Sequence, residues 1–457
     1  FYLFSDFGNI SQQKLFDEVL GEIEVGEEMG FDSVWLPEHH FEIYGMLGNP
    51  LLLAAAVAQR TKTMKIGTAI VVVLVITLVN GVLLRGFLAG ANRIFQPQNS
   101  TTEAGVVQPQ EAERSGSPES FAPWDTLGYQ GRTFVATGPH ADELTRLNGA
   151  PATEPIRVYA GLQTAESDEA RMAVLLSELE RTGAFEREVL VIVPTTGTGW
   201  INPTAAAAIE MMYNGDSAIV GSQYSYLPSW ISFLAHQQKS MEAGRMMIDA
   251  IHDRWVQLPD NERPKLLLYG ESLGSTAGQG AFDWLPDISR MGFSSVLWVG
   301  PPNASPLWHG LTVRRDPGTP EVEPRYDDGR TVRFSQGNDA AAIAADTAPP
   351  WEGTRVLFLQ HASDPIAWWT PDLLFREPDW LKERRGYDVS PRMDWMPVVT
   401  FLQVSADMAV AVNVPDGHGH VYVRDVVNGF FILLENQYAV GEVITIGSMT
   451  GTVEQIT

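Results

Sequence analysis

The chain has 457 residues, of which 31 are Lys or Arg and 56 are Asp or Glu, giving a formal net charge of −25 at pH 7. Apolar residues make up 44% and charged residues 19%, which excludes wholesale disorder and a collagen-like fibre. The length predicts roughly two to four globular units. So negative a chain repels phosphodiester backbones, so we expect no nucleic-acid partner. Without cysteine there is no disulfide, thiolate nucleophile or Cys-ligated zinc.

The N-terminal part carries one uncharged run. Residues 1–9 lack the basic and then apolar stretches of a secretory signal. Residues 70–84 are uncharged, and with the residues up to 89 they reach the ~20 residues that span a bilayer. Two interpretations remain: a membrane contact through residues 70–89, or a buried strand that leads into a core helix. Residues 96–120 are rich in Pro, Gln, Ser and Glu and predict a solvated linker.

From residue 155 onward, short apolar strands alternate with amphipathic helices. The alternation predicts an α/β fold with a doubly wound, mostly parallel sheet that helices cover on both faces. Residues 302–353 interrupt it with Pro, Gly, Arg and Asp, and predict a long loop or cap near a substrate site. The expected strands are PIRVYA, EVLVIVP, AIVGSQY, KLLLYG, SSVLWVG and RVLFLQH, and the expected helices cover residues 167–181, 204–213 and 230–256 and a segment after Ser272.

The KLLLYG strand ends in GESLG at residues 270–274, the G-x-S-x-G pattern, before a segment that can form a helix. Small residues two before and two after a serine let the backbone turn sharply, which exposes the serine Oγ at a strand-to-helix turn. The pattern alone is weak, but its position after a buried strand strengthens it. We therefore interpret Ser272 as a nucleophile.

A serine nucleophile needs a base, and the base needs an orienting acid. Asp364 follows the RVLFLQH strand, and the later GHGH loop carries His418 and His420. The order Ser, Asp, His is that of α/β-hydrolases. We favour His420 as the base because it opens the HVYV run, and keep His418 as the alternative. Other interpretations make Asp364 a helix N-cap before Pro365, or the histidines an H-x-H metal pair that lacks a third ligand.

The oxyanion of an acyl-transfer reaction needs backbone N–H donors. Leu273, directly after the nucleophile, offers one. A second is expected from Thr196 or Gly197, in the TTGTGW loop that follows the EVLVIVP strand. This loop does not match a phosphate-binding loop, because no Gly-Lys-Ser/Thr follows it.

Residues of about 74–428 resemble an actinobacterial family of membrane-anchored α/β-hydrolases. The resemblance rests on SGSPESFAPWDTLGYQGRTFV, TTGTGWINP, QYSYLPSWISFL, RPKLLLYGESLGS and VPDGHGHVY. It implies a serine hydrolase in which Ser272, Asp364 and a histidine of the GHGH loop act together without a cofactor. It also implies a bacterial, membrane-associated location, with residues 74–95 as the last membrane helix and 121–428 as the catalytic domain.

The two ends resemble other families. Residues 1–73 are similar to the start of luciferase-like flavin-dependent monooxygenases, through FYLFSDFG and GFDSVWLPEHHF. The resemblance places Glu38, His39 and His40 at the mouth of a β/α-barrel. However, the three strands that it implies for residues 1–73 cannot close an eight-stranded barrel. Residues 429–457 are similar to the small β-domain of the mechanosensitive channel family. We interpret the chain as a chimera whose intact part is the centre.

The sequence therefore predicts a serine hydrolase, esterase- or lipase-like, that cleaves a carboxylic ester or thioester through an acyl-enzyme on Ser272. The substrate is expected to be a small-molecule or lipid ester, and the apolar SYLPSWISFL segment is compatible with a greasy one. Two alternatives are a catalytically inactive hydrolase-fold binding protein and a fragment of a flavin-dependent monooxygenase.

Overall fold

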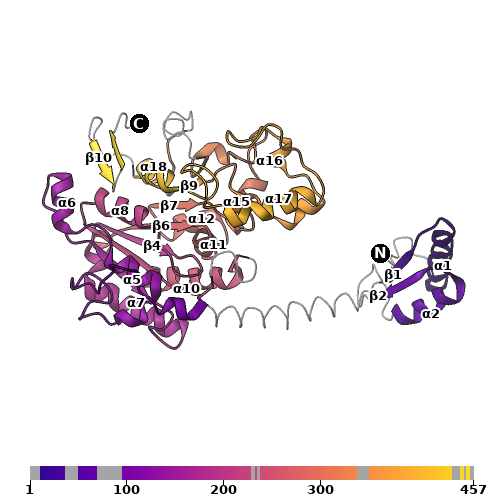
Figure 1. The fold of residues 1–457 in the computed structure, drawn as a ribbon, viewed down its shortest axis with the longest axis horizontal. Coiled ribbons are helices and arrows are strands. Elements are labelled where there is room, and N and C mark those ends of the chain that lie inside the picture. The colour runs from indigo at the N-terminus through magenta and orange to yellow at the C-terminus, as the bar shows by residue number, and fades with distance from the viewer. Residues whose placement is uncertain are drawn as a thin grey trace. The chain divides into compact units, whose positions relative to one another are not determined.

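The computed structural model describes residues 11–36, 50–68, 95–227, 232–233, 237–336, 349–434, 443–446 and 449–452. The chain divides into two compact units, Phe1–Arg93 and Ile94–Thr457 (Figure 1). The predictions for Glu38, His39 and His40 and for the run at residues 70–89 lie outside the described residues. None of the helices within the described ranges is long and apolar enough to cross a membrane.

The smaller unit is a β/α fragment. Its helices α1 (Gln12–Glu28) and α2 (Pro50–Arg60) pack on the parallel strands β1 (Ser33–Leu36) and β2 (Lys65–Thr68). Apolar side chains of these elements form a small core of their own. Within GFDSVWLPEHHF the structure has the strand β1, while FYLFSDFG lies outside the described residues.

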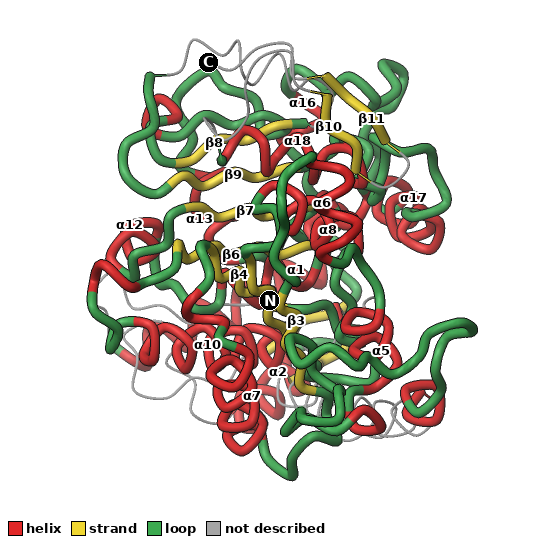
Figure 2. The backbone as a smooth tube through the Cα atoms, turned by 90° about the vertical axis from the view of Figure 1, so that its left-hand side faces the viewer, coloured by secondary structure: helices red, strands yellow, loops and turns green. Residues whose placement is uncertain are grey.

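The larger unit is built on a seven-stranded sheet with the order β3-β5-β4-β6-β7-β9-β8, in which all neighbouring strands pair in parallel (Figure 2). The predicted α/β doubly wound fold is confirmed. The strands are β3 (Ile156–Ala160), β4 (Val189–Pro194), β5 (Ser217–Ser222), β6 (Lys265–Glu271), β7 (Ser295–Val299), β8 (Val332–Ser335) and β9 (Arg355–Leu359).

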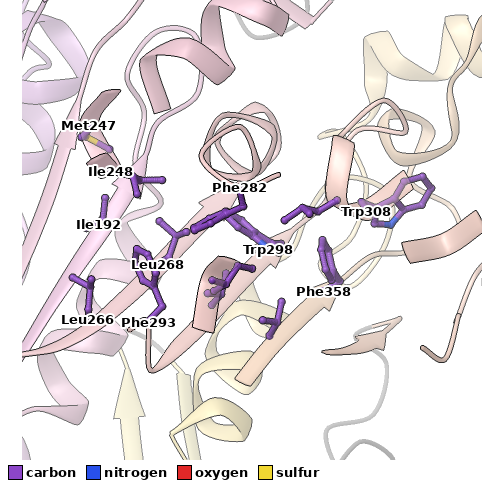
Figure 3. Packing of buried hydrophobic residues seen from close by; sticks show 14 of the residues in the cluster. Ile192, Met247, Ile248, Leu266, Leu268, Phe282, Phe293, Trp298, Trp308 and Phe358 are labelled. Carbon is purple, nitrogen blue, oxygen red and sulfur yellow. The ribbon is translucent and has the colours of Figure 1, made fainter. Parts of the chain in front are cut away.

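Helices cover both faces of this sheet because its strands are apolar on both sides. In β4, Leu190 and Ile192 enter one core while Val191 and Val193 enter the other, as the two-residue period of a strand requires. Figure 3 shows the first core, where Trp298 and Phe358 of the sheet pack among helix side chains. The first core receives side chains of α7 (Asp168–Thr182), α10 (Gln237–Trp255), α12 (Leu285–Arg290) and α13 (Pro306–Val313), and the second those of α5 (Gly128–Ala136), α6 (Ala141–Asn148), α8 (Pro203–Met212) and α18 (Val423–Leu433).

The sequence missed β8, which lies within the segment predicted as a loop or cap at residues 302–353. The strand is short and pairs only with β9 at the sheet edge. The other α-helices and strands described in this unit are α11 (Leu273–Gln279), α15 (Pro365–Trp368), α16 (Asp379–Lys382), α17 (Val399–Asp407) and the antiparallel pair β10 (Val443–Ile446) and β11 (Met449–Thr452).

The prediction of a solvated linker at residues 96–120 is wrong for its last part. Arg114 and Ser115 are fully buried, and the Ser115 N–H donates to the carbonyl of Arg157 in β3 at 3.0 Å. The Ser115 hydroxyl donates to the Glu178 carboxylate at 2.7 Å. These polar residues are buried because each finds a hydrogen-bond partner in the domain, which composition does not reveal.

The boundary predicted between residues 428 and 429 is also wrong, because it falls inside α18. Phe430 and Leu433 are buried in the second core, and Gly429 lies against Leu297 and Leu359 of the sheet. The helix is continuous because apolar residues on both sides of the predicted boundary face the same core.

Candidate active site

Ser272 lies at the turn between β6 and α11, with φ 54° and ψ −126°. A non-glycine residue in this region is strained by about 1–3 kcal/mol. The turn needs its glycines, since a Cβ on Gly270 would come within 2.7 Å of the Gly274 carbonyl oxygen. The Ser272 N–H donates to the Val299 carbonyl at 2.8 Å, which ties the turn to β7. The strand-to-helix turn predicted around Ser272 is therefore present.

Asp364 follows β9 and is fully buried. Its Oδ2 is 2.7 Å from Nδ1 of His420 and accepts a hydrogen bond from the Tyr422 hydroxyl at 2.8 Å. Its Oδ1 accepts from the Ile366 N–H at 2.8 Å, as the N-cap of α15. The two interpretations of Asp364, histidine partner and helix cap, are therefore both right, with one carboxylate oxygen for each.

His420 lies next to the turn that carries Ser272. A Cβ on Gly300, the residue after β7, would come within 2.8 Å of the His420 ring, and the preceding Val299 is hydrogen-bonded to Ser272. Since Asp364 occupies Nδ1, Nε2 is the nitrogen left for proton transfer. The strands β6, β7 and β9 are neighbours in the sheet. The residues that follow them therefore lie together at the carboxyl edge of the sheet.

His418 has different surroundings. Its Nδ1 is 3.3 Å from Oδ2 of Asp388, and its side chain is 45% exposed. The two loop histidines therefore contact different carboxylates, Asp388 and Asp364.

Charges around His420 favour its protonated form. Burial alone lowers the pKa of His420, but the negative charge and hydrogen bond of Asp364, together with the charge of Glu271, raise it above its ordinary value. Burial raises the pKa of Glu271, against hydrogen bonds from the Tyr269 hydroxyl and from Nδ2 of Asn202 at 2.9 Å. The sequence analysis gave Glu271 no role, although it is the variable residue directly before the serine of G-x-S-x-G.

The predicted oxyanion donors come from two segments that the structure brings together. Leu273 is the first residue of α11, where backbone N–H groups lack partners within the helix. A Cβ on Gly274 would come within 2.3 Å of the Pro194 carbonyl oxygen, so the loop carrying Thr196 and Gly197 begins against the same helix end. This contact explains why small residues are needed there.

Several buried or half-buried polar residues near the site were missed. His361, Ser363 and Tyr422 make hydrogen bonds with Asp364 or with the loop that carries His420. The only signal in the sequence is their spacing: His361 and Ser363 stand within three residues of Asp364, and Tyr422 two residues after His420.

Comparisons with known proteins agree with two parts of this description. The "Luciferase-like monooxygenase" family model matches residues 1–79. The alkanal monooxygenase alpha chain of Photorhabdus laumondii is 44% identical over 62 residues, 14% of this chain and 17% of that protein. The oxygenase component of the flavin-dependent trigonelline monooxygenase of Acinetobacter baylyi is 32% identical over 62 residues, with the same coverage. The chain thus spans about a sixth of the length of these relatives.

The larger unit matches a different family. The acylaminoacyl peptidase of Pyrococcus horikoshii aligns with 29% of this chain and 21% of its own, at 12% identity and a TM-score of 0.17. An "Alpha/beta-hydrolase family N-terminus" model matches residues 50–139. The "Alpha/beta-hydrolase family" model matches residues 156–443, more than half of the chain and every strand of the seven-stranded sheet. The chain therefore belongs to the alpha/beta-hydrolase family.

Proposed function

We propose that the protein is a serine hydrolase that cleaves carboxylic ester or thioester bonds through an acyl-enzyme on Ser272. The Ser272 Oγ attacks the substrate carbonyl while Nε2 of His420 takes the hydroxyl proton. Asp364 holds the protonated Nδ1 of His420, and its charge stabilises the imidazolium that forms. The oxyanion accepts hydrogen bonds from the N–H of Leu273 and from an N–H of Thr196 or Gly197.

The second half of the reaction uses the same groups in reverse. The proton on His420 passes to the leaving alcohol or thiol, and the acyl group stays on the Ser272 Oγ. Water then attacks the acyl carbonyl while His420 takes its proton. The carboxylic acid departs, and the proton returns to the serine oxygen.

The observation that carries this proposal is the 2.7 Å contact between the fully buried Asp364 and the His420 side chain, which is 9% exposed, beside a serine with a strained backbone. A non-glycine residue at φ 54° costs about 1–3 kcal/mol, and such strain is enriched at active sites. Val398 and three other described non-glycine residues also have positive φ, so the strain supports catalysis because it falls on the serine of G-x-S-x-G, beside a His–Asp pair. The combination supports acyl transfer over binding alone.

A fluorophosphonate probe tests the proposal because it reacts with an activated serine hydroxyl. We expect the full-length protein to be labelled on Ser272 and the Ser272→Ala variant to remain unlabelled. Ser305→Ala is the matched control: Ser305 is buried and its hydroxyl is 2.7 Å from that of Thr276 in α11, but it lies away from the turn. Labelling that persists in Ser272→Ala would exclude the proposal. Turnover of p-nitrophenyl esters of increasing acyl length then identifies the preferred substrate.

A further inference from the structure

The segment that carries Asp364 also holds the loop that carries His420. Nδ1 of His361 is 2.8 Å from the Gly419 carbonyl oxygen, and the Gly419 N–H donates to the Ser363 hydroxyl at 2.9 Å. Both backbone polar groups of the residue before His420 are therefore bound by side chains from residues 361–363. Asp364 then contacts His420 itself.

The other nitrogen of His361 contacts a buried carboxylate. Nε2 is 3.1 Å from Oδ2 of Asp425, in the first turn of α18, and both side chains are almost completely buried. The His361 ring stacks on Tyr422 with 3.9 Å between ring centroids, and the His361 N–H donates to the Tyr422 hydroxyl at 2.9 Å. That hydroxyl in turn donates to Asp364. Tyr422 therefore links the backbone of His361 to the carboxylate that contacts His420.

The chemistry of the two acceptors decides the protonation of His361. A carbonyl oxygen only accepts a hydrogen bond, so Nδ1 carries a proton, and the Asp425 carboxylate oxygen likewise accepts from Nε2. Burial lowers the pKa of His361, but the hydrogen bond and charge of Asp425, together with the Gly419 carbonyl, raise it above its ordinary value. Both nitrogens therefore act as donors.

We propose that His361 and Ser363 are positioning residues of the hydrolase: by holding Gly419 at its carbonyl and its amide, they fix where the His420 imidazole stands relative to Asp364 and Ser272. This inference rests on the proposed function. It differs from a purely structural ion pair between His361 and Asp425, because it assigns the effect on the reaction to the contact with Gly419.

Two substitutions of His361 separate these roles. The amide nitrogen of Asn stands close to where Nδ1 stood, so His361→Asn keeps a donor for Gly419 but removes the contact with Asp425. The amide nitrogen of Gln stands closer to Nε2, so His361→Gln keeps the contact with Asp425 but removes the one with Gly419. Both variants lose the stacking on Tyr422, which makes them a matched pair.

We expect the order of activity to oppose the order of stability. His361→Gln should be labelled by the fluorophosphonate about 100-fold more slowly than the wild-type protein, the size of effect that a misplacement of about 1 Å causes. His361→Asn should be labelled at least about tenfold faster than His361→Gln although it melts at a lower temperature, since it leaves a carboxylate buried without its partner. Equal labelling of the two, or labelling that follows the melting temperature, would overturn the inference.

Ser363 provides an independent measurement if neither His361 variant folds. Ser363→Ala removes the acceptor for the Gly419 N–H, and we expect labelling to fall about tenfold or more. Asp388 also accepts a hydrogen bond from Ser363, so Asp388→Asn is the control and should retain labelling. Wild-type labelling of Ser363→Ala would reject the inference, whereas an unlabelled wild-type protein would reject the proposed function instead.

Discussion

Replacing Asp364 with Asn removes the charge but keeps the shape of the side chain. The carboxylate accepts three hydrogen bonds: from His420 and Tyr422 at Oδ2, and from the Ile366 N–H at Oδ1. An Asn amide has only one acceptor atom. If its NH₂ faces His420, Nδ1 must become an acceptor, the proton moves to Nε2, and the base is lost. If its NH₂ faces Ile366 instead, two donors meet in a buried site.

The magnitude follows from the geometry. With the unit charges of Asp364 and the imidazolium about 3 to 4 Å apart and an effective dielectric constant of about 20, their attraction is roughly 4 to 6 kcal/mol. Each 1.36 kcal/mol corresponds to a factor of about ten in rate. We therefore expect Asp364→Asn to slow acylation by about 10³- to 10⁴-fold, comparable with the effect of the same change in serine proteases.

The assay is the second-order rate of fluorophosphonate labelling, measured with a thermal melt of each variant. Asp388→Asn is the matched control, because it makes the same change in the carboxylate that contacts His418. It should stay within about threefold of the wild-type rate, because an amide oxygen at this position can still accept from the Ser363 hydroxyl and the His418 side chain is 45% exposed. The reasoning is refuted if Asp364→Asn labels within tenfold of the wild type while it stays folded, or if Asp388→Asn is the slower variant.

Three further predictions test the surroundings of the site. Because the base must be neutral, kcat/KM should fall as the pH drops through the raised pKa of His420. Glu271→Gln should move the midpoint of this pH profile to lower pH, because it removes a negative charge that raises the pKa of His420. An unchanged midpoint would contradict the electrostatic argument. Gly274→Ala should lower kcat by about 10²-fold or more, because the added Cβ displaces the loop that carries the second oxyanion donor. An unaltered kcat would show that this loop does not supply that donor. Arg157→Met should lower the free energy of unfolding by about 3–5 kcal/mol, since it leaves the Glu210 carboxylate buried without its bidentate partner. In denaturant unfolding, the double variant that also carries Glu210→Leu should recover much of this loss.

The same pKa shift has opposite consequences for activity and for stability. A histidine whose pKa is raised on folding binds its proton more tightly in the folded state, so His420 contributes stability that is complete below its ordinary pKa of about 6.5. This contribution is lost as the pH rises through the raised value, which is the range in which the base becomes active. Thermal melts across this range should therefore show the protein becoming less stable as its kcat/KM rises.

The sheet was predictable because its strands are buried on both faces. Runs such as VLVIV and LLLY have no polar residue to accommodate, so their pattern alone indicates a central strand. The strand β8 escaped prediction because VRFS is short and lies at the edge, where a polar side chain is tolerated. The positions of Ser272 and Asp364 were predictable for the same reason, since Ser272 comes directly after a strand that the pattern identifies and Asp364 comes a few residues after another.

The rest of the site was not predictable because it depends on contacts between distant segments. Glu271, His361 and Tyr422 are buried, and their partners Asn202, Asp425 and Asp364 lie in distant parts of the sequence. Only the folded chain shows that the His361 ring reaches Gly419 while its backbone N–H reaches Tyr422. Residues 96–120 illustrate the same limit, because nothing in the sequence links Ser115 to Glu178, which lies in α7.

The helix α18 shows how far the catalytic unit extends. Its second half lies beyond the boundary that the sequence suggested at residue 428, yet it packs against β6, the strand that leads to Ser272. The ring centroids of Phe430 and Tyr269 are 5.5 Å apart. The Tyr269 hydroxyl donates to Glu271, which stands directly before Ser272. A helix needs only apolar residues at the right spacing to fill this face of the sheet. A resemblance to another family after residue 428 therefore does not separate these residues from the hydrolase core, because packing depends on the side chains present and not on the family they resemble.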